Sequence, residues 1–285
     1  MTLRQLYYQL VTQNIIPNKE ESYDNLGKLV SKARLAGLLD WNHLVDRTRN
    51  LQSISTWKNP SAILDTAAQA FRIDKWAKQP VRIEVWIEKE ALAGVFARVC
   101  EEMFIPYFAC KGYNSQSEAW RASLRMRQYL KAGQQPVILH FGDHDPSGLD
   151  MTRDITDRMQ VFMADVRVER MALNMAQVEA YNPPPNPTKL TDSRAHGENG
   201  YIALHGHESW ELDALPPDVL NDLVRTEVEK LRDDDQWQED VDTENEHRAT
   251  LRAISNNFGD VHQYTIDQGW IDEETEAGEG SEEDK

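Results

Sequence analysis

Between residues 82 and 173 of this chain, apolar residues follow two patterns, one typical of strands and one typical of helices. Short apolar or alternating runs at 82–87, 105–110, 136–141 and 166–173 are typical of strands. Between the runs, residues 92–99, residues 115–130 and the segment from Leu149 show the spacing of amphipathic helices. Strands that alternate with helices predict an α/β fold, in which a parallel sheet carries helices on both faces.

The chain begins with a different pattern. Residues 2–11 place apolar side chains at positions 3, 6, 7, 10 and 11, which predicts an amphipathic helix whose apolar face includes Tyr7 but not Tyr8. Residues 23–38 favour one or two further helices, and Asp46 to Arg49 open a segment compatible with a small β wing. We therefore expect a helix-turn-helix of the winged type.

The second half of the chain is less regular. A short helix is expected at 176–181, a Pro-rich irregular segment at 182–187, and helices at 216–230 and 243–257, with Asp233 to Asp235 as a solvated linker. Residues 272–285 are acidic and nearly free of apolar side chains, which predicts a disordered tail. The predicted domains are 1–78, 79–271 and the tail at 272–285.

Acidic residues follow two of the predicted strands. Segment 142–148 reads Gly-Asp-His-Asp-Pro-Ser-Gly and follows the strand at 136–141, while Glu88 follows the strand at 82–87. The carboxyl ends of parallel strands share one edge, so Glu88, Asp143 and Asp145 can converge there. Their oxygen atoms suit Mg²⁺. A solvated turn is the alternative, because Asp, Pro, Ser and Gly are ordinary turn formers.

Arg4 and Tyr8 form a second candidate group. They lie one helical turn apart on the same face, where the guanidinium can hold a phosphate or favour the phenolate form of the tyrosine. Tyr8 is thus a candidate nucleophile. The alternative is that Tyr7 and Tyr8 both simply pack against the rest of the protein.

Charge is distributed unevenly along the chain. The net charge is −17, yet residues 1–80 hold 11 basic and 7 acidic residues, a local balance of +4. Residues 211–285 hold 6 basic and 24 acidic residues. The basic end therefore suits a nucleic-acid contact. No apolar stretch approaches the roughly 20 residues of a membrane span, so no membrane partner is expected. Two cysteines, both expected inside secondary structure, favour a reducing cytoplasm.

These motifs resemble those of a known family. Glu88 at one strand end, followed by Asp-x-Asp-x-x-Gly from Asp143, resembles the Toprim domain of topoisomerases and primases over about residues 81–175. Arg-Gln-Leu-Tyr-Tyr from Arg4 resembles Arg-Asp-x-Tyr-Tyr in the winged-helix domain that the A subunit of topoisomerase VI shares with the meiotic double-strand-break transesterase. It departs at Gln5, where the family has an acid. Trp-Glu-Leu-Asp-Ala-Leu from Trp210 resembles short stand-alone members, called topoisomerase mini-A.

The resemblance implies a fold and a function. It implies an N-terminal winged-helix domain and a Rossmann-like Toprim domain. In the family, the second tyrosine attacks DNA and becomes linked to a 5′ phosphate. Carried over, Tyr8 is the nucleophile, Arg4 stabilises the reacting phosphate and Lys89 contacts the DNA backbone. Glu88, Asp143 and Asp145 hold Mg²⁺.

The resemblance also implies partners. It implies a homodimer acting on double-stranded DNA, in which the tyrosine of one protomer works with the metal site of the other. A separate ATPase subunit would be needed for strand passage. A bacterial or phage-encoded protein associated with the nucleoid is expected.

Two rival functions remain open at this point. One is a Toprim nuclease in which metal-activated water cuts DNA, and the other is a non-catalytic DNA-binding protein. The acids after Trp210 can join the metal edge, although a surface helix with Trp210 and Leu212 packed inward is favoured. His140 and His144 suggest zinc only weakly, because no third soft ligand is adjacent.

Overall fold

The computed structural model describes residues 2–13, 15–41, 43–44, 54–113, 115–162 and 164–271. Contacts within the chain divide it into two compact units. The first, here the sheet unit, joins Met1–Asn50 to Trp76–Asp233, and the second, here the helical unit, joins Leu51–Lys75 to Asp234–Lys285. This division differs from the predicted domains, because each unit is built from two segments that are distant in the sequence.

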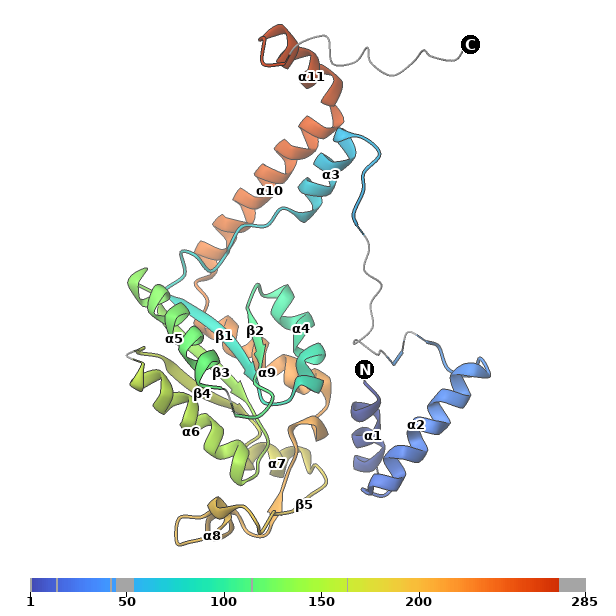
Figure 1. Cartoon of the computed structure of the whole chain (residues 1–285), viewed down its shortest axis with the longest axis vertical. Coiled ribbons are helices and arrows are strands. Elements are labelled where there is room, and N and C mark those ends of the chain that lie inside the picture. Colours follow the sequence, from blue (N-terminus) through green and yellow to red (C-terminus); the bar gives the residue numbers. More distant parts are fainter. Residues whose placement is uncertain are drawn as a thin grey trace, which may run out of the picture. The chain divides into compact units, whose positions relative to one another are not determined.

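A four-stranded parallel sheet forms the centre of the sheet unit (Figure 1). Its strands lie in the order β2 (Tyr107–Ala109), β1 (Val81–Ile87), β3 (Gln135–Phe141) and β4 (Arg167–Ala172). They occur where the apolar runs predict them, although β2 is only three residues long. The α/β class and the parallel sheet are confirmed.

Helices cover both faces of this sheet, as predicted. One face carries α5 (Gln116–Lys131) and α6 (Pro146–Val161), and the other carries α4 (Ala93–Glu102) and α9 (Pro217–Leu231) (Figure 1). Alternate strand residues serve the two faces: Trp86 and Ile138 pack with Met126 of α5, while the ring of Phe141 lies 4.7 Å from that of Phe96 in α4. Burial on both sides explains why most residues of the central strands are apolar. The buried Glu84 of β1 is compensated by hydrogen bonds from Arg125 and Trp86.

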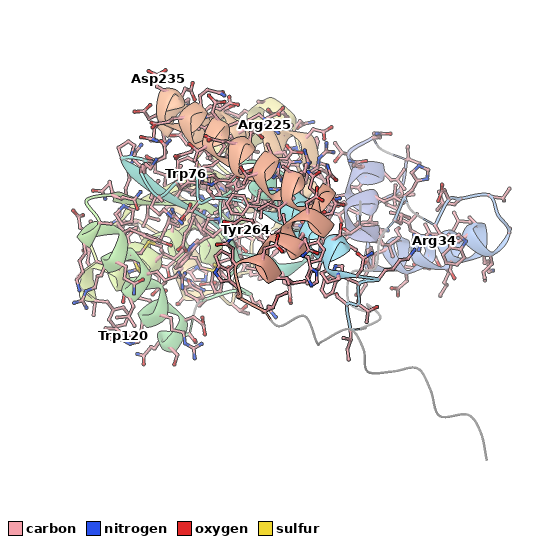
Figure 2. The ribbon with its side chains drawn as sticks, turned by 90° about the horizontal axis from the view of Figure 1, so that it is seen from above. Arg34, Trp76, Trp120, Arg225, Asp235 and Tyr264 are labelled. Atoms are coloured by element: carbon pink, nitrogen blue, oxygen red, sulfur yellow. The ribbon has the colours of Figure 1, made fainter. Side chains whose placement is uncertain are left out.

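Short elements complete the sheet unit. They are η1 (Glu90–Leu92), α7 (Met175–Tyr181), β5 (Asn186–Pro187), η2 (Ser193–Ala195), α8 (Tyr201–His205), β6 (Glu208–Ser209) and η3 (Leu212–Ala214). β5 and β6 pair antiparallel as a second, two-stranded sheet. Outside the core, Trp120 of α5 projects at the surface (Figure 2).

Two N-terminal helices, α1 (Leu3–Thr12) and α2 (Glu20–Leu35), also belong to the sheet unit. Thr2 and Gln5 form a reciprocal cap that fixes the start of α1. Both Tyr7 and Tyr8 are buried and pack in a cluster with Ala214 of η3. The prediction that Tyr8 lies outside the apolar face is therefore wrong, because η3 covers the side of α1 that the sequence pattern leaves polar.

The helical unit consists of α3 (Pro60–Ala70), α10 (Asp234–Asn256) and α11 (Phe258–Asp267). α3 packs on α10, and Ser61 Oγ donates to the Ser255 backbone oxygen at 2.8 Å. Figure 2 marks Asp235 near the start of α10 and Tyr264 on α11. The predicted solvated linker at 233–235 is wrong, because Asp234 and Asp235 form the first turn of α10, where acids complement the helix dipole.

Two predictions lie outside the described residues. The wing expected from Asp46 to Arg49 and the disordered tail expected at 272–285 both fall there. The winged-helix assignment stays a prediction. Within the described residues, the helices include none that is long and apolar enough to cross a membrane.

Candidate functional site

The register of the sheet brings Glu88 next to the acidic loop at 142–148. Ile87 of β1 pairs with Phe141 of β3, so the residue after each strand leaves the same edge. The Glu88 backbone N–H donates to the Phe141 carbonyl at 2.8 Å, and Glu88 Oε2 accepts from the Asp143 backbone N–H at 2.8 Å. Two of the three predicted metal ligands are therefore in direct contact.

Two glycines allow this close approach. A Cβ atom at Gly148 would lie 2.2 Å from the Asp143 carbonyl oxygen, and one at Gly142 would lie 2.9 Å from Glu88 Oε2. Any larger residue at Gly148 would collide with the backbone of the loop that carries Asp143. The final glycine of the Asp-x-Asp-x-x-Gly motif thus has a steric reason within this chain.

Asp145 begins α6 as its N-cap. Its Oδ1 accepts from the Gly148 backbone N–H at 2.7 Å and from Ser147 Oγ at 2.8 Å, and Pro146 occupies the first helical position. The alternative of a solvated turn is therefore wrong, because Asp143 and His144 are buried and the segment leads directly into α6. Capping does not displace the metal-ligand prediction, because these bonds use one oxygen of the carboxylate.

A half-buried arginine hydrogen-bonds to the backbone of this loop. Arg170 of β4 donates to the carbonyl oxygens of Gly142 at 3.0 Å, Asp143 at 2.5 Å and Gly148 at 2.8 Å. Burial lowers the pKa of Arg170 to about 10, although Glu88 and the loop acids act in the opposite direction. Its positive charge thus lies close to the carboxylates of Glu88, Asp143 and Asp145, and no motif in the sequence signals it.

The segment after β6 adds two acids to the same edge. Backbone bonds of 2.8 and 2.9 Å join His144 to Trp210, and the Leu212 N–H donates to Asp143 Oδ1 at 2.8 Å. Trp210 and Leu212 are buried, as predicted. The expected surface helix is wrong, however, since Asp213 is only 2% exposed and turns toward the site.

Lys89 lies among three carboxylates. Its Nζ is 2.9 Å from Asp143 Oδ2, 2.9 Å from Glu211 Oε2 and 3.4 Å from Asp213 Oδ1. Burial alone would lower the pKa of Lys89, but these three acids raise it above its usual value. The ammonium group is therefore firmly charged. We call Arg4, Tyr8, Lys89, Asp143, Glu211 and Asp213 the ionic cluster.

Arg4 and Tyr8 reach this cluster from α1. Tyr8 Oη donates to Glu211 Oε2 at 3.0 Å, and Arg4 Nη2 lies 2.6 Å from the same oxygen, with Arg4 Nε on Asp213. The Arg4 guanidinium also lies 5.5 Å from the centre of the Tyr8 ring. Burial, together with Glu211 and Asp213, raises the pKa of Tyr8 despite Arg4. In this arrangement the phenol keeps its proton.

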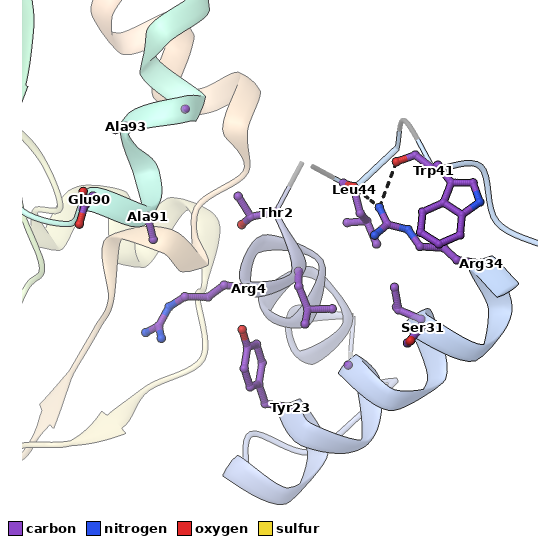
Figure 3. A pocket seen from close by; sticks show the side chains of 14 residues that line it. Thr2, Arg4, Tyr23, Ser31, Arg34, Trp41, Leu44, Glu90, Ala91 and Ala93 are labelled. Atoms are coloured by element: carbon purple, nitrogen blue, oxygen red, sulfur yellow. Dashed lines mark hydrogen bonds between the residues drawn. The ribbon is translucent and has the colours of Figure 1, made fainter. Parts of the chain in front are cut away.

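Two openings adjoin the cluster. A shallow one of about 360 Å³ is lined by Arg4, Glu88, Lys89 and their neighbours, including Lys111. A larger one of about 870 Å³ lies between α1, α2 and residues 90–94, and Figure 3 shows the Arg4 side chain extending from α1 on the side of Glu90 and Ala91. The cationic groups of the cluster are thus accessible from solvent, whereas Tyr8 is 6% exposed.

The acids of this edge fit a divalent cation by charge and by chemistry. Among the described residues, five carboxylates face three cationic groups here, an excess of two negative formal charges; the acids are Glu88, Asp143, Asp145, Glu211 and Asp213, and the cations are Arg4, Lys89 and Arg170. Burial, and then Asp143, raises the pKa of Glu88 although Lys89 and the Asp143 N–H act in the opposite direction, so its ionised form is incompletely compensated. All five supply the oxygen atoms that Mg²⁺ prefers.

The side-chain positions nevertheless do not form a finished metal centre. Within the described residues, no three acidic, histidine or cysteine side chains are grouped closely enough to hold a metal ion. One reason is that Lys89 occupies Asp143 Oδ2. His140 bonds Thr152 and lies in the α6 face of the sheet, so it adds no zinc ligand.

All six residues predicted for the site therefore lie at or beside one edge of the sheet. Their roles in metal binding and cleavage stay predictions. Glu211 and Asp213 were underestimated, because the backbone pairing of His144 with Trp210 has no signal in the sequence. Comparisons with known protein families, with curated proteins and with solved structures gave no match.

Proposed function

We propose that this chain is a Mg²⁺-dependent DNA-cleaving enzyme that uses Tyr8 for transesterification, as the A subunit of topoisomerase VI does. One observation carries the proposal. The Tyr8 hydroxyl lies 3.0 Å from Glu211 in a cluster that also holds Arg4 and Lys89, at the sheet edge that bears the predicted metal ligands. A tyrosine that only packs has no need of a hydroxyl bonded to an acid that two cations share.

The proposed reaction exchanges one ester for another. Tyr8 Oη attacks a DNA phosphorus in line, forming a bond to the 5′ phosphate, while the bond from phosphorus to the 3′ oxygen breaks. Arg4 and Lys89 bind the phosphate oxygens on which negative charge develops, since both cations border the accessible opening. The products are a 5′-phosphotyrosyl protein and a free 3′ hydroxyl.

The metal would be held by Glu88, Asp143 and Asp145. When bound, Mg²⁺ would offset phosphate charge and help to position the DNA backbone. Lys89 must release Asp143 for this role, and a phosphate offers the ammonium group an alternative partner. The excess of negative charge at this edge supports the assignment.

Double-strand cleavage requires two copies of the chain. One tyrosine cuts one strand, so we propose a homodimer with two-fold symmetry on double-stranded DNA. The local charge of +4 in residues 1–80 supports DNA contact by the N-terminal helices. Strand passage driven by ATP would need a separate ATPase subunit.

A second function is favoured by the burial of the nucleophile. Tyr8 is 6% exposed and its hydroxyl is bonded to Glu211, so DNA reaches it only after α1 shifts. If α1 stays in place, the accessible groups are Glu88, Lys89 and Arg4. These suit a hydrolytic nuclease in which water attacks the phosphate.

The deciding experiment uses supercoiled plasmid DNA and Mg²⁺. Reactions are quenched with detergent, and half of each is digested with protease before electrophoresis. Wild type is compared with Tyr8→Phe and with a matched control, Tyr7→Phe. Tyr7 is buried in the same helix, but its hydroxyl bonds Asn18 and the Lys19 carbonyl instead of the site.

The transesterase predicts broken DNA that enters the gel only after proteolysis. This product should vanish in Tyr8→Phe and persist in Tyr7→Phe. Cleavage that persists in Tyr8→Phe without bound protein would instead establish the hydrolytic nuclease. Absence of cleavage by wild-type protein over a range of Mg²⁺ concentrations and DNA forms would reject both.

A further inference from the structure

We propose that Glu211 is the general base for Tyr8 and that both groups come from the same chain. This inference rests on the proposed function and assigns the proton acceptor that the reaction requires. It also departs from the family resemblance, which implies that the tyrosine and the metal site act across a dimer.

The geometry places Glu211 on the reacting atom. Tyr8 Oη donates to Glu211 Oε2 at 3.0 Å, within the distance that proton transfer requires. The contact joins residues 203 positions apart in the sequence, and packing of α1 on η3 through Tyr8 and Ala214 maintains it. Glu211 is therefore a catalytic residue by contact, whereas Asp213 contacts the cations Arg4 and Lys89.

Arg4 and Lys89 explain how the proton affinity of Glu211 changes when DNA binds. Arg4 Nη2 and Lys89 Nζ lie 2.6 and 2.9 Å from the same Glu211 oxygen that accepts from Tyr8. Burial would raise the pKa of Glu211, but these two cations lower it, so the resting carboxylate is ionised and a weak base. A DNA phosphate attracts the same cations. As they turn to the phosphate, the proton affinity of Glu211 rises.

The proton balance of the step is complete. The Tyr8 proton passes to Glu211 as the bond from Oη to phosphorus forms. The 3′ oxygen leaves with the electron pair of the broken bond and takes a proton from water. Glu211 then returns its proton to water, so that the step consumes no net proton.

The first test measures formation of the covalent protein–DNA product in a single turnover. Glu211→Gln keeps the shape of the side chain and removes the basic carboxylate, and we expect a rate lower by roughly 10²–10⁴-fold. A fluorinated tyrosine at position 8 has a more acidic phenol and needs the base less. In the Glu211→Gln variant, it should raise the rate of covalent product formation at least tenfold.

Asp213→Asn is the matched control. Asp213 bonds the same Arg4 and Lys89 but is not bonded to Tyr8, so its loss changes the cations without removing the base. Fluorination should leave the deficit of Asp213→Asn unchanged. Equal recovery in both variants, or a wild-type rate in Glu211→Gln, would overturn the role of Glu211 as base.

A second variant covers the case in which Glu211→Gln does not fold. Glu211→Asp keeps the charge and withdraws the carboxylate by one methylene group. It should fold, as checked by circular dichroism and DNA binding, and should react more slowly by at least tenfold. Fluorination should recover this loss too, and a rate equal to wild type would contradict the proposal.

The same-chain origin has its own test. Chains carrying Glu211→Gln and Tyr8→Phe are expressed together with two tags and purified through both. If Glu211 serves the tyrosine of its own chain, every site in the mixed protein lacks one group, and covalent product forms no faster than in Glu211→Gln alone. Recovered cleavage would place the base on the partner. A protein that never carries both tags is not a stable dimer, which leaves only the same-chain arrangement.

Failure of this inference differs visibly from failure of the proposed function. If Tyr8 is not a nucleophile, wild-type protein forms no covalent product at all. If Tyr8 is the nucleophile but Glu211 is not its base, the wild-type product forms, and Glu211→Gln either matches its rate or recovers upon fluorination no more than Asp213→Asn does.

Discussion

The two units of this protein differ in how their buried charges are paired. In the helical unit, Lys75 and Glu244 form an ion pair of 2.6 Å, with side chains 4% and 7% exposed, and the Ile73 N–H also donates to Glu244. In the sheet unit, Lys89 contacts three carboxylates beside a solvent-accessible opening. The first arrangement is closed and paired, whereas the second is crowded and open.

The difference separates a structural from a functional use of charge. A buried ion pair with good hydrogen bonds fixes how two segments pack, and little is gained by changing its charge state. A cluster with excess negative charge next to an opening can exchange its partners for a cation or a phosphate. Shifted pKa values gather at such sites. Variants in the two clusters should therefore differ in what they damage.

The largest effect is expected from Asp143→Asn. This change keeps the hydrogen bond from Leu212 but removes a charge from the predicted metal site. Cleavage should fall by about 10³-fold or more, which corresponds to about 4 kcal/mol in the barrier. The measurement is Mg²⁺-dependent plasmid cleavage at equal folded fraction. Unchanged cleavage would remove Asp143 from the site.

The complementary change in the helical unit is Lys75→Met. It leaves Glu244 buried with a weaker set of partners, and we expect a loss of about 3 kcal/mol in the free energy of unfolding of that unit. Urea titration followed by Trp fluorescence measures it. Folded Lys75→Met should cleave DNA at the wild-type rate, and a specific catalytic defect would contradict the division of roles.

Much of the fold follows from local pattern, while the site depends partly on pairing at long range. Strands β1 and β3 were predictable because both are mostly apolar, and acids follow each of them. Their parallel pairing brought Glu88 beside Asp143. The burial of Gln5, Tyr8 and Asp213 could not be predicted from the sequence. Their burial comes from contact between α1 and η3, which lie about two hundred residues apart and share no sequence periodicity.

Glu88→Gln should change the free energy of unfolding by less than Lys75→Met does, and should increase it. The folded-state pKa of Glu88 is raised by burial and by Asp143, so ionisation destabilises the fold, and stability falls as pH rises through that pKa. Without Mg²⁺, the variant should be more stable than wild type by about 1–2 kcal/mol at pH 8. The gain should shrink toward pH 5, where Glu88 in wild type is protonated.

Thermal unfolding with and without Mg²⁺ measures this difference. Mg²⁺ should stabilise the wild-type protein because it offsets the crowded charge, and should stabilise Glu88→Gln less. A variant that is less stable than wild type at pH 8 would show that Glu88 is well paired. The site would then resemble the Lys75–Glu244 pair, and the contrast between the two clusters would fail.

The smallest expected change in stability comes from variants of Asp145, which distinguish its role as a helix cap from its proposed role as a Mg²⁺ ligand. As an N-cap, its carboxylate accepts from the Gly148 N–H and Ser147 Oγ, and Asp145→Ala should lose about 1 kcal/mol of stability. Asp145→Asn keeps an acceptor oxygen and should unfold at nearly the wild-type temperature. If Asp145 only caps α6, Asp145→Asn will cleave DNA normally; if it binds Mg²⁺, cleavage will fall although stability is kept. We expect the second result, because both capping bonds engage the same oxygen, and Asp145 lies close enough to Glu88 for its charge to raise the pKa of that acid.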